Sequence, residues 1–162
     1  MNDDKYYIKE INYLNSDDYR KMNSVCRFWF SEPKTLNLTS PSMPYPFQFK
    51  KWVDFYQKNS ESVFSYAVQR DDWIIGHGSI QIKKKIGHIF HVIIDSGYRR
   101  KGLASKLIKE LKEKVHQKGV KEITLNVDRK NLAAFHLYEK LGFLKDMDVS
   151  KNTLRMKTKL YA

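Results

Sequence analysis

The sequence is almost free of cysteine: Cys26 is the only one among its 162 residues. A single cysteine can form no intrachain disulfide and cannot supply a cysteine-rich metal site. The five histidines, at positions 77, 88, 91, 116 and 136, do not show the spacing of zinc ligands such as HExxH. We therefore expect a protein without intrachain disulfides and without a metal cofactor.

Long apolar runs are also missing from the sequence. No stretch approaches the roughly 20 consecutive apolar residues of a membrane-spanning helix, and the first ten residues, MNDDKYYIKE, lack the apolar segment of a signal peptide. The composition is 41% hydrophobic and 14% aromatic, which is enough for a buried core in a chain of this length. We expect one cytoplasmic domain over residues 1–162, with no membrane partner.

Acidic residues are scarce relative to basic ones. The chain has 18 acidic and 30 basic side chains, which gives a formal net charge of +12. Such a balance is one mark of a nucleic-acid-binding protein. However, only seven of the basic residues are arginine, the residue suited to reading bases in a fixed geometry. Because no helix-turn-helix, zinc-finger or RNA-recognition signature is present, we favour a lysine-rich solvated surface over a nucleic-acid partner.

Hydrophobic periodicity predicts an α/β arrangement of strands and helices. A strand, a helix and a strand follow one another between residues 87 and 127, which implies a parallel strand pair joined by a right-handed crossover. Ser16 or Asp17 is expected to cap the first helix, and Pro33 is expected to end that region. The expected strands cover about residues 5–12, 64–69, 73–83, 87–94, 123–127, 143–149 and 153–160, and the expected helices about 17–30, 47–58, 103–117 and 132–141.

The most informative stretch covers residues 91–104, HVIIDSGYRRKGLA. It begins with an apolar, β-branched run typical of a strand that is covered on both faces. Helical spacing of leucine and isoleucine begins at Leu103, and the basic turn before it contains Gly102. A strand that enters a helix through such a turn gathers free backbone N–H groups and the positive helix end at one point. This pattern predicts an anion-binding site.

A second informative pattern covers residues 131–143, NLAAFHLYEKLGF. Asn131, Ala134 and Tyr138 lie three and seven positions apart, so they share one face of a predicted helix. Two plain alternatives are that Asn131 only caps this helix and that Tyr138 only packs in the core.

Together the two patterns resemble the motifs of the GNAT superfamily of N-acetyltransferases, over about residues 73–143. The first is Arg99-x-x-Gly102-x-Ala104, and it departs from the family at Ala104, where glycine is commoner. The resemblance implies a mixed, mostly antiparallel twisted sheet with a central splayed parallel strand pair and helices on both faces. It also implies transfer of an acetyl group from acetyl-CoA to a primary amine, by direct attack in a ternary complex.

The resemblance also implies roles for individual residues. The loop amides before the helix would bind the CoA pyrophosphate, the preceding strand would pair with the pantetheine arm, and Asn131 would hydrogen-bond that arm. Tyr138 would protonate the leaving thiolate. The cofactor site implied in this way consists of Val92, Ile93, Ile94, Arg99, Arg100, Lys101, Gly102, Leu103, Ala104, Asn131, Ala134 and Tyr138.

Acyl transfer also needs a group that accepts a proton from the amine. Many GNAT enzymes resemble one another in placing a Glu or His early on the strand before the pyrophosphate loop, and His88 stands there. We expect His88 and Phe90 on one face of that strand and His91 on the other. An imidazole that titrates near neutrality suits this role, and the alternative is a structural hydrogen bond. His91 and Glu139 are the weaker candidates.

The resemblance implies a primary amine as the acceptor, either a small molecule or a protein N-terminus. One alternative function is a non-catalytic, CoA-binding regulatory module of the same fold, which would lack the acid and base positions. Another is a nucleic-acid-binding module, whose binding would fall steeply with salt. For the oligomeric state, a monomer and a homodimer are both compatible with the sequence.

Overall fold

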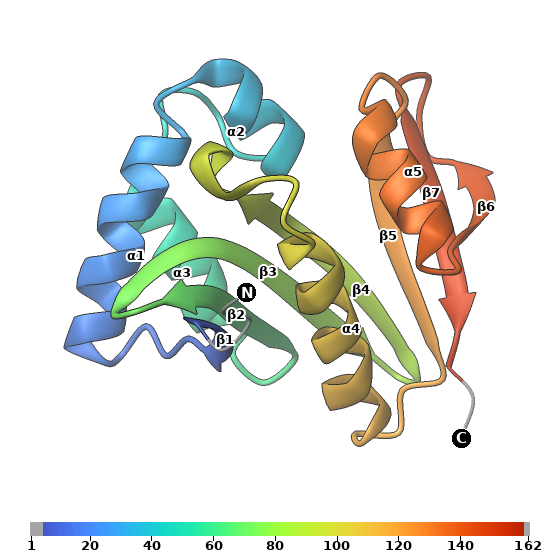
Figure 1. The fold of residues 1–162 in the computed structure, drawn as a ribbon, viewed down its shortest axis with the longest axis horizontal. Helices are drawn as coiled ribbons and strands as arrows, with labels where there is room; N and C mark the ends of the chain where they lie inside the picture. The colour runs from blue at the N-terminus through green and yellow to red at the C-terminus, as the bar shows by residue number, and fades with distance from the viewer. Residues whose placement is uncertain (1–4, 161–162) are drawn as a thin grey trace.

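A seven-stranded sheet organises the protein in the computed structural model, which describes residues 5–160 (Figure 1). The strands lie in the order β1-β2-β3-β4-β5-β7-β6, and only β4 and β5 are parallel. The predicted mixed, mostly antiparallel sheet with one parallel pair is therefore confirmed. The strands are β1 (Tyr6–Glu10), β2 (Val63–Arg70), β3 (Trp73–Lys83), β4 (Ile86–Ile94), β5 (Glu122–Asp128), β6 (Leu144–Asp148) and β7 (Thr153–Lys159).

Five α-helices and one short 3₁₀ turn connect these strands. No helix within residues 5–160 is long and apolar enough to cross a membrane. The helices are α1 (Ser16–Trp29), α2 (Pro33–Thr39), α3 (Phe49–Lys58), α4 (Leu103–His116) and α5 (Leu132–Lys140), and the 3₁₀ turn is Ser96–Tyr98.

The beginnings of α1 and α2 differ from the sequence prediction. The cap of α1 is Asn15, whose side chain accepts a hydrogen bond from the amide of Asp18, so the prediction of Ser16 or Asp17 is wrong. Asn15 keeps the extended backbone of a cap, whereas Ser16 already lies within the helix. Helix α2 was not predicted at all. Pro33 stands in its first turn, where proline removes no helical hydrogen bond, so this proline begins a helix.

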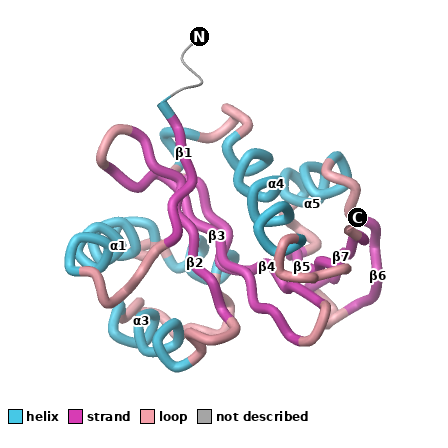
Figure 2. Tube along the Cα trace, turned by 90° about the horizontal axis from the view of Figure 1, so that it is seen from below, coloured by secondary structure: helices cyan, strands magenta, loops and turns pink. Residues whose placement is uncertain are grey.

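Helices cover both faces of the sheet, as predicted (Figure 2). On one face, α1, α2 and α3 enclose an aromatic core whose largest buried side chains are Trp52 and Phe30. On the other face, α4 and α5 enclose a mainly aliphatic core that includes Leu107 and Leu111. We call these the aromatic face and the aliphatic face.

The parallel pair β4 and β5 is joined only at its beginning. Ile86–Ile89 of β4 pair with Glu122–Leu125 of β5, and the two strands diverge beyond that point (Figure 1). The β5-facing edge of β4 from Phe90 to Ile94 therefore has no strand partner among the described residues. The predicted splay of the central pair is confirmed, and it opens the sheet at its middle.

A bulge in β4 sits beside this opening. Phe90 pairs with Ser79 of β3 and Ile93 pairs with His77, so two β4 residues, His91 and Val92, stand opposite one residue of β3. This count of two against one defines a β-bulge. The backbone of His91 is left-handed, with φ of 52°, a conformation in which histidine is enriched relative to most other residues.

The bulge reverses the expected direction of one histidine side chain. His91 stacks on Trp52 of the aromatic face with 4.3 Å between ring centroids, and its ring lies 4.6 Å from that of Phe90. His88 also stacks against Phe90. The prediction that His88 and His91 face opposite sides of the sheet is therefore wrong, because the bulge interrupts the two-residue alternation on which it relied.

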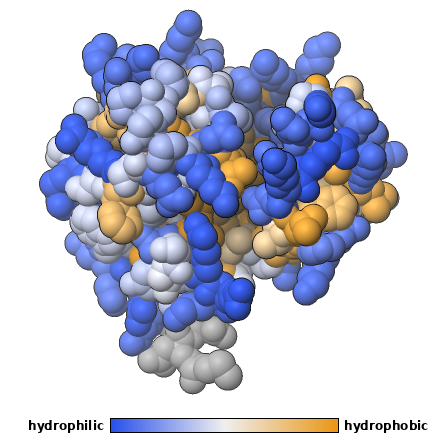
Figure 3. Space-filling view, turned by 90° about the horizontal axis from the view of Figure 1, so that it is seen from above, coloured by the Kyte–Doolittle hydropathy of each residue, from blue (hydrophilic) through white to orange (hydrophobic). Residues whose placement is uncertain are grey.

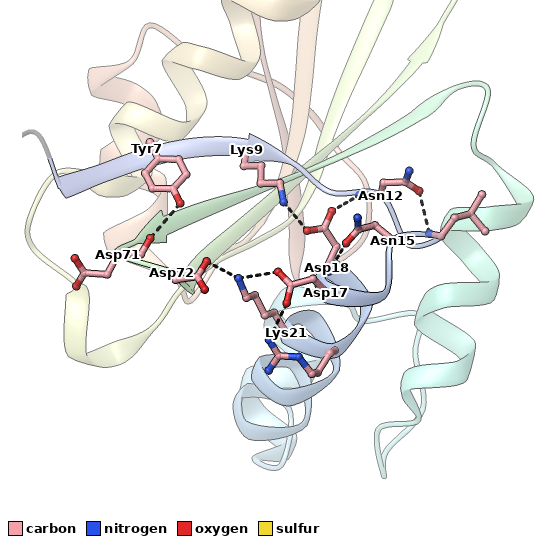
Figure 4. A network of polar contacts seen from close by, with 11 residues as sticks. Tyr7, Lys9, Asn12, Asn15, Asp17, Asp18, Lys21, Asp71 and Asp72 are labelled. Carbon is pink, nitrogen blue, oxygen red and sulfur yellow. Dashed lines mark hydrogen bonds and ion pairs between the residues drawn. The ribbon is translucent and has the colours of Figure 1, made fainter.

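A network of ion pairs fixes β1 and α1 to the turn between β2 and β3 (Figure 4). The buried carboxylate of Asp18 accepts hydrogen bonds from Lys9 and from the Asn12 amide. Lys21, whose side chain is 3% exposed, lies between Asp17 and Asp72. These two carboxylates raise the pKa of Lys21, with hydrogen bonding to Asp72 as the largest cause. The network thus keeps a buried lysine charged.

Candidate functional site

A cleft of about 420 Å³ lies where β4 and β5 part. Its walls come from four segments that are distant in the sequence: the end of α2 with the loop after it, the second half of β4, the end of β5 with α5, and the turn between β6 and β7. The space-filling view from above shows a hollow between the two halves of the molecule with apolar side chains on its floor (Figure 3). The two sequence motifs meet at this cleft.

The basic loop before α4 has the geometry of an anion site. Gly102 adopts φ of 75°, and a Cβ built there would meet no atom within 4 Å, so the space beside it is open. In the part of the chain that the structure describes, the amides of Arg100 to Ala104 donate to no protein acceptor. Arg99 is anchored, because its Nε donates to the carbonyl of Ile94 at 3.1 Å. These free amides stand at the N-terminus of α4, where an anion is stabilised.

The second motif contributes one wall of the cleft. Asn131 caps α5 by accepting a hydrogen bond from the Ala134 amide at 3.3 Å, which confirms the capping alternative and leaves a second role open. Tyr138 is 8% exposed and lines the cleft with Asn131 and Ala134. Burial raises the pKa of Tyr138 to about 12, so its hydroxyl keeps its proton at neutral pH.

His88 lines the same cleft, but its chemistry differs from the expectation. Its Nδ1 lies 2.7 Å from the hydroxyl of Thr124 on β5. Burial, together with the nearby positive charges of Arg155 and Lys83, lowers the pKa of His88 to about 4. The expected titration near neutrality is therefore wrong, because the imidazole is largely removed from water. The structural hydrogen bond held open as an alternative is present.

His91 is more deeply buried than His88, at 7% exposure, and still contributes to the cleft wall. Its Nε2 lies 2.9 Å from the hydroxyl of Ser40, and its Nδ1 lies 2.7 Å from the hydroxyl of Tyr56. Burial lowers the pKa of His91 well below its usual value, and the charge of His77 acts in the same direction. Both ring nitrogens of His91 are thus engaged at neutral pH.

The remaining predicted site residues divide into three groups. Val92 lines the cleft, whereas the side chains of Ile93 and Ile94 are buried on opposite faces of the sheet. Leu103 is buried in the aliphatic core and Ala104 packs against it, while Arg100 and Lys101 are exposed in the loop. Glu139 lies on the exposed side of α5, next to His136, and does not line the cleft. The structure therefore does not bring Glu139 to the site.

Sequence reasoning missed one wall of the cleft. Ser40 is buried at the end of α2, and it reaches the cleft together with the residues around it. Tyr56 of α3 and His77 of β3 were also missed as polar partners of the site. Pro33 was the available signal for α2, but the contacts themselves join residues between 14 and 51 positions apart.

Comparison with known proteins identifies the family to which this fold belongs. Residues 30–143 match the family model described as Acetyltransferase (GNAT) family. The match covers more than half of the chain, so the protein belongs to the GNAT acetyltransferase family. The predicted family is thereby confirmed.

Among residues 5–160, no three His, Cys, Asp or Glu side chains are grouped so as to hold a metal ion.

Curated relatives share part of the chain. A [ribosomal protein bS18]-alanine N-acetyltransferase from Salmonella typhimurium is 28% identical over 89 residues, which cover 55% of this chain and 60% of that protein. A glucosamine 6-phosphate N-acetyltransferase from Trypanosoma brucei brucei is 38% identical over 77 residues, covering 43% and 50%. The chain thus spans between half and three-fifths of the length of these relatives.

Solved structures share the whole fold. A spermidine N-acetyltransferase from Vibrio cholerae, in complex with CoA and spermine, superimposes with a TM-score of 0.79 at 17% identity, covering 97% of this chain and 96% of that one. The PaiA N-acetyltransferase from Thermoplasma acidophilum, in complex with coenzyme A, has a TM-score of 0.72 at 18% identity, covering 96% and 99%. At these identities the likeness establishes the fold.

Proposed function

We propose that this protein is an N-acetyltransferase that moves an acetyl group from acetyl-CoA to a primary amine by direct attack in a ternary complex. The observation that carries the proposal is the cleft between β4 and β5. It brings the unpaired edge of β4 and the buried Tyr138 together. The loop with the free amides follows the end of β4 directly in the chain. The family to which the chain belongs supports the same conclusion.

The cofactor fits the residues that are present. The amides from Arg100 to Ala104 would hold the pyrophosphate of CoA, with Arg99 and Arg100 adding positive charge. The backbone of Val92 and Ile94 on the unpaired β4 edge would hold the pantetheine arm, as an added strand does. The amide of Asn131 would bind that arm from the opposite wall. The net charge of +12 favours attraction of this polyanionic ligand.

Tyr138 is proposed as the acid that protonates the departing thiolate. Its pKa of about 12 means that the proton is present at neutral pH and is held until a strong base forms beside it. The amine must in turn lose a proton, and two histidines of the cleft wall, His88 and His91, are the candidates to receive it. The presence of these groups argues against a non-catalytic CoA-binding module.

The acceptor is proposed only at the level of its reacting group, a primary amine. The names of the relatives include a ribosomal-protein alanine and a phosphorylated amino sugar as acceptors. These differ in size and charge, so they support a shared amine and nothing narrower. We also propose that the chain acts as one cytoplasmic domain, as a monomer or a homodimer, and that nucleic acid is not its partner.

Release of free thiol from acetyl-CoA, measured against a panel of primary amines, tests the proposed function. The panel should include an N-terminal alanine peptide, an amino sugar phosphate and a polyamine. We expect amine-dependent thiol release with at least one member, and acetylation of that amine by mass spectrometry. Tight CoA binding without thiol release for any member would instead support the regulatory alternative.

The variant Gly102→Val is the matched test of the cofactor site. Valine at φ of 75° strains the backbone, and its side chain enters the open space beside the free amides. Loss of one or two charge-assisted hydrogen bonds should lower acetyl-CoA affinity roughly tenfold to hundredfold. Calorimetric titration measures the change, and unchanged affinity in a folded variant would rule out this loop as the pyrophosphate site.

A further inference from the structure

A continuous chain of hydrogen bonds runs through the aromatic face from the cleft into the protein. Each link lies between 2.5 and 3.3 Å, and every member is buried. In order, the links are Ser40 Oγ to His91 Nε2 at 2.9 Å, His91 Nδ1 to Tyr56 Oη at 2.7 Å, Tyr56 Oη to Ser79 Oγ at 2.5 Å, Ser79 Oγ to His77 Nε2 at 3.3 Å, His77 Nε2 to Ser65 Oγ at 2.7 Å, and Ser65 Oγ to Tyr13 Oη at 3.1 Å.

The two ends of this chain open into different cavities. Ser40 and His91 line the cleft between β4 and β5. Tyr13 and Ser65, together with Tyr56, line a second cavity of about 680 Å³ between the end of β1, α3 and the start of β2. No residue of either sequence motif lines this second cavity. The chain therefore crosses the aromatic face from the candidate active site to a separate opening.

The protonation state of His77 gives the chain a direction. Its Nδ1 lies 2.8 Å from the carbonyl oxygen of His91, which can only accept, so Nδ1 carries a hydrogen. Burial lowers the pKa of His77 to about 4, so its Nε2 is unprotonated at neutral pH. That nitrogen is therefore the acceptor for the hydroxyls of Ser65 and Ser79. His77 is a buried proton acceptor, 0% exposed, which is reached only through hydroxyl groups.

At the other end, the bulge in β4 aims His91 at the cleft wall. Its left-handed backbone turns the ring away from the face that a regular strand would give it. A left-handed backbone costs free energy at a non-glycine residue, and such residues cluster at sites where the position of a side chain serves a function. His77 of β3 contacts the backbone of His91, and His88 of β4 lines the same cleft.

We propose that Ser40, His91, Tyr56, Ser79 and His77 form a proton relay that carries the proton of the acceptor amine away from the cleft, with Ser65 and Tyr13 as its exit to the second cavity. This inference rests on the proposed acetyl transfer. It assigns a role to the buried polar groups of the aromatic face that the cofactor site does not use.

The relay balances as a series of proton shifts. As the amine nitrogen bonds to the thioester carbon and the C–S bond breaks, the nitrogen gives a proton to Ser40, and the Ser40 proton moves to Nε2 of His91. The Nδ1 proton of His91 moves to Tyr56, the Tyr56 proton to Ser79, and the Ser79 proton to Nε2 of His77. No net charge remains on the intervening hydroxyls. His77 does not hold this proton at neutral pH. Once the hydroxyl hydrogens of Ser65 and Tyr13 have rotated away from their resting acceptors, Nε2 of His77 gives its proton to Ser65, the Ser65 proton moves to Tyr13, and Tyr13 releases its own into the second cavity.

His88 does not offer the same path. Its only hydrogen-bond partner in the described chain is Thr124, which lies within β5 and makes no further side-chain hydrogen bond. A proton taken by His88 can leave only by returning to the cleft. His91, in contrast, is joined to a buried acceptor by three successive links. The geometry thus separates two histidines that the sequence ranked in the opposite order.

The test uses single-turnover acetyl transfer by the full chain, loaded with acetyl-CoA and mixed with an amine found active in the panel. Rates are measured in H₂O, in D₂O and in mixtures of the two. Tyr56→Phe keeps the ring but removes the hydroxyl that joins His91 to Ser79. Ser79→Ala interrupts the next link with a smaller change. Tyr66→Phe is the matched control, because Tyr66 is an equally buried tyrosine on the aliphatic face, outside the chain.

For the wild type we expect a solvent isotope effect whose dependence on the D₂O fraction is curved, because several protons move together. Tyr56→Phe and Ser79→Ala should slow the transfer roughly tenfold to hundredfold and make that dependence linear, with acetyl-CoA affinity unchanged. Tyr66→Phe should behave as the wild type. A merely structural role of the network would lower the unfolding temperature without changing the isotope effect.

The outcomes separate this inference from the proposed function. If the wild type transfers acetyl to no amine, the proposed function fails and the relay fails with it. If the wild type is active, and folded Tyr56→Phe and Ser79→Ala both keep its rate and its curved isotope dependence, only the relay is overturned. If His88→Gln alone removes the curvature, the proton leaves by way of the cleft and the relay is likewise overturned.

Discussion

The two faces of the sheet are packed with different kinds of side chain. On the aliphatic face, α4 contributes Leu107 and Leu111, both fully buried, against the sheet. On the aromatic face, Trp52 and Tyr56 of α3 pack among buried polar side chains. Trp52 donates a hydrogen bond to the hydroxyl of Tyr13, and the hydroxyl of Tyr56 is hydrogen-bonded to His91 and Ser79. The aliphatic face is therefore held mainly by apolar contact, with Lys106 and Lys112 of α4 donating hydrogen bonds to main-chain carbonyls. The aromatic face combines apolar contact with a connected polar network.

Adjacent residues of β3 show what this difference serves. Gly78 faces α4 so closely that a Cβ there would lie 2.8 Å from the side chain of Leu107. The next residue back, His77, points into the aromatic face and bonds the His91 carbonyl. The aliphatic face thus fixes the position of α4 and of the anion-binding loop before it, whereas the aromatic face fixes the side chains of the cleft wall.

The largest effect in this comparison is expected for stability on the aliphatic face. Leu107→Ala should lower the free energy of unfolding by about 2–5 kcal/mol, because it leaves a cavity between α4 and β3. Ser65→Ala on the aromatic face should cost about 1–3 kcal/mol, because Tyr13 and His77 lose a buried partner. Denaturant titration of both variants checks the order. A larger loss for Ser65→Ala would mean that the polar network carries more of the stability than apolar packing does.

The next largest effect is expected for turnover at the cleft. Tyr138→Phe keeps the packing of the aliphatic face and removes only the hydroxyl proton. Acetyl transfer should slow by roughly ten- to a thousandfold, with acetyl-CoA affinity unchanged. Single-turnover kinetics and calorimetric titration measure the two quantities, and Tyr66→Phe on the same face serves as control. A wild-type rate in Tyr138→Phe would show that water or another group protonates the thiolate.

The aliphatic face and the loop before α4 are the parts whose structure the sequence predicted well. Residues 91–104 contain the end of β4, a turn and the beginning of α4, and residues 131–143 contain the cap and the whole of α5. Their conformation depends on local rules, such as a left-handed glycine before α4 and an asparagine cap before α5. The conformation of such segments can be predicted from residues that are neighbours in the sequence.

The aromatic face could not be predicted in the same way. Its hydrogen bonds join residues far apart in the sequence, such as Tyr13 with Ser65 and Ser40 with His91, each pair separated by more than 50 positions. The bulge at His91 depends on the register of β4 against β3, which no local pattern specifies. The direction of His91 and the depressed pKa of His88 follow from these distant contacts and from burial.

The smallest effect is expected for His88→Gln at neutral pH. Burial lowers the pKa of His88 to about 4, so its imidazole is already neutral over the whole range from about pH 6 to about pH 9. Removing it should therefore leave the shape of the kcat/KM profile unchanged in that range, with a rate within about twofold of the wild type. Any rise of rate with pH there should come from the acceptor amine as it loses its proton.

Stability against pH provides the independent check on His88. The folded pKa of about 4 lies below the unfolded value of 6.5, so the unfolded chain binds more protons between these two pH values. The wild type should lose stability as the pH falls from about 6.5 towards about 4, and His88→Gln should lose less over the same interval. His77 and His91, whose pKa values are also lowered by burial, should contribute to the slope that remains in the variant. If His88→Gln instead loses a limb of the rate profile near neutrality, then His88 titrates there in the working enzyme and receives the amine proton itself, and the contrast between the two β4 histidines disappears.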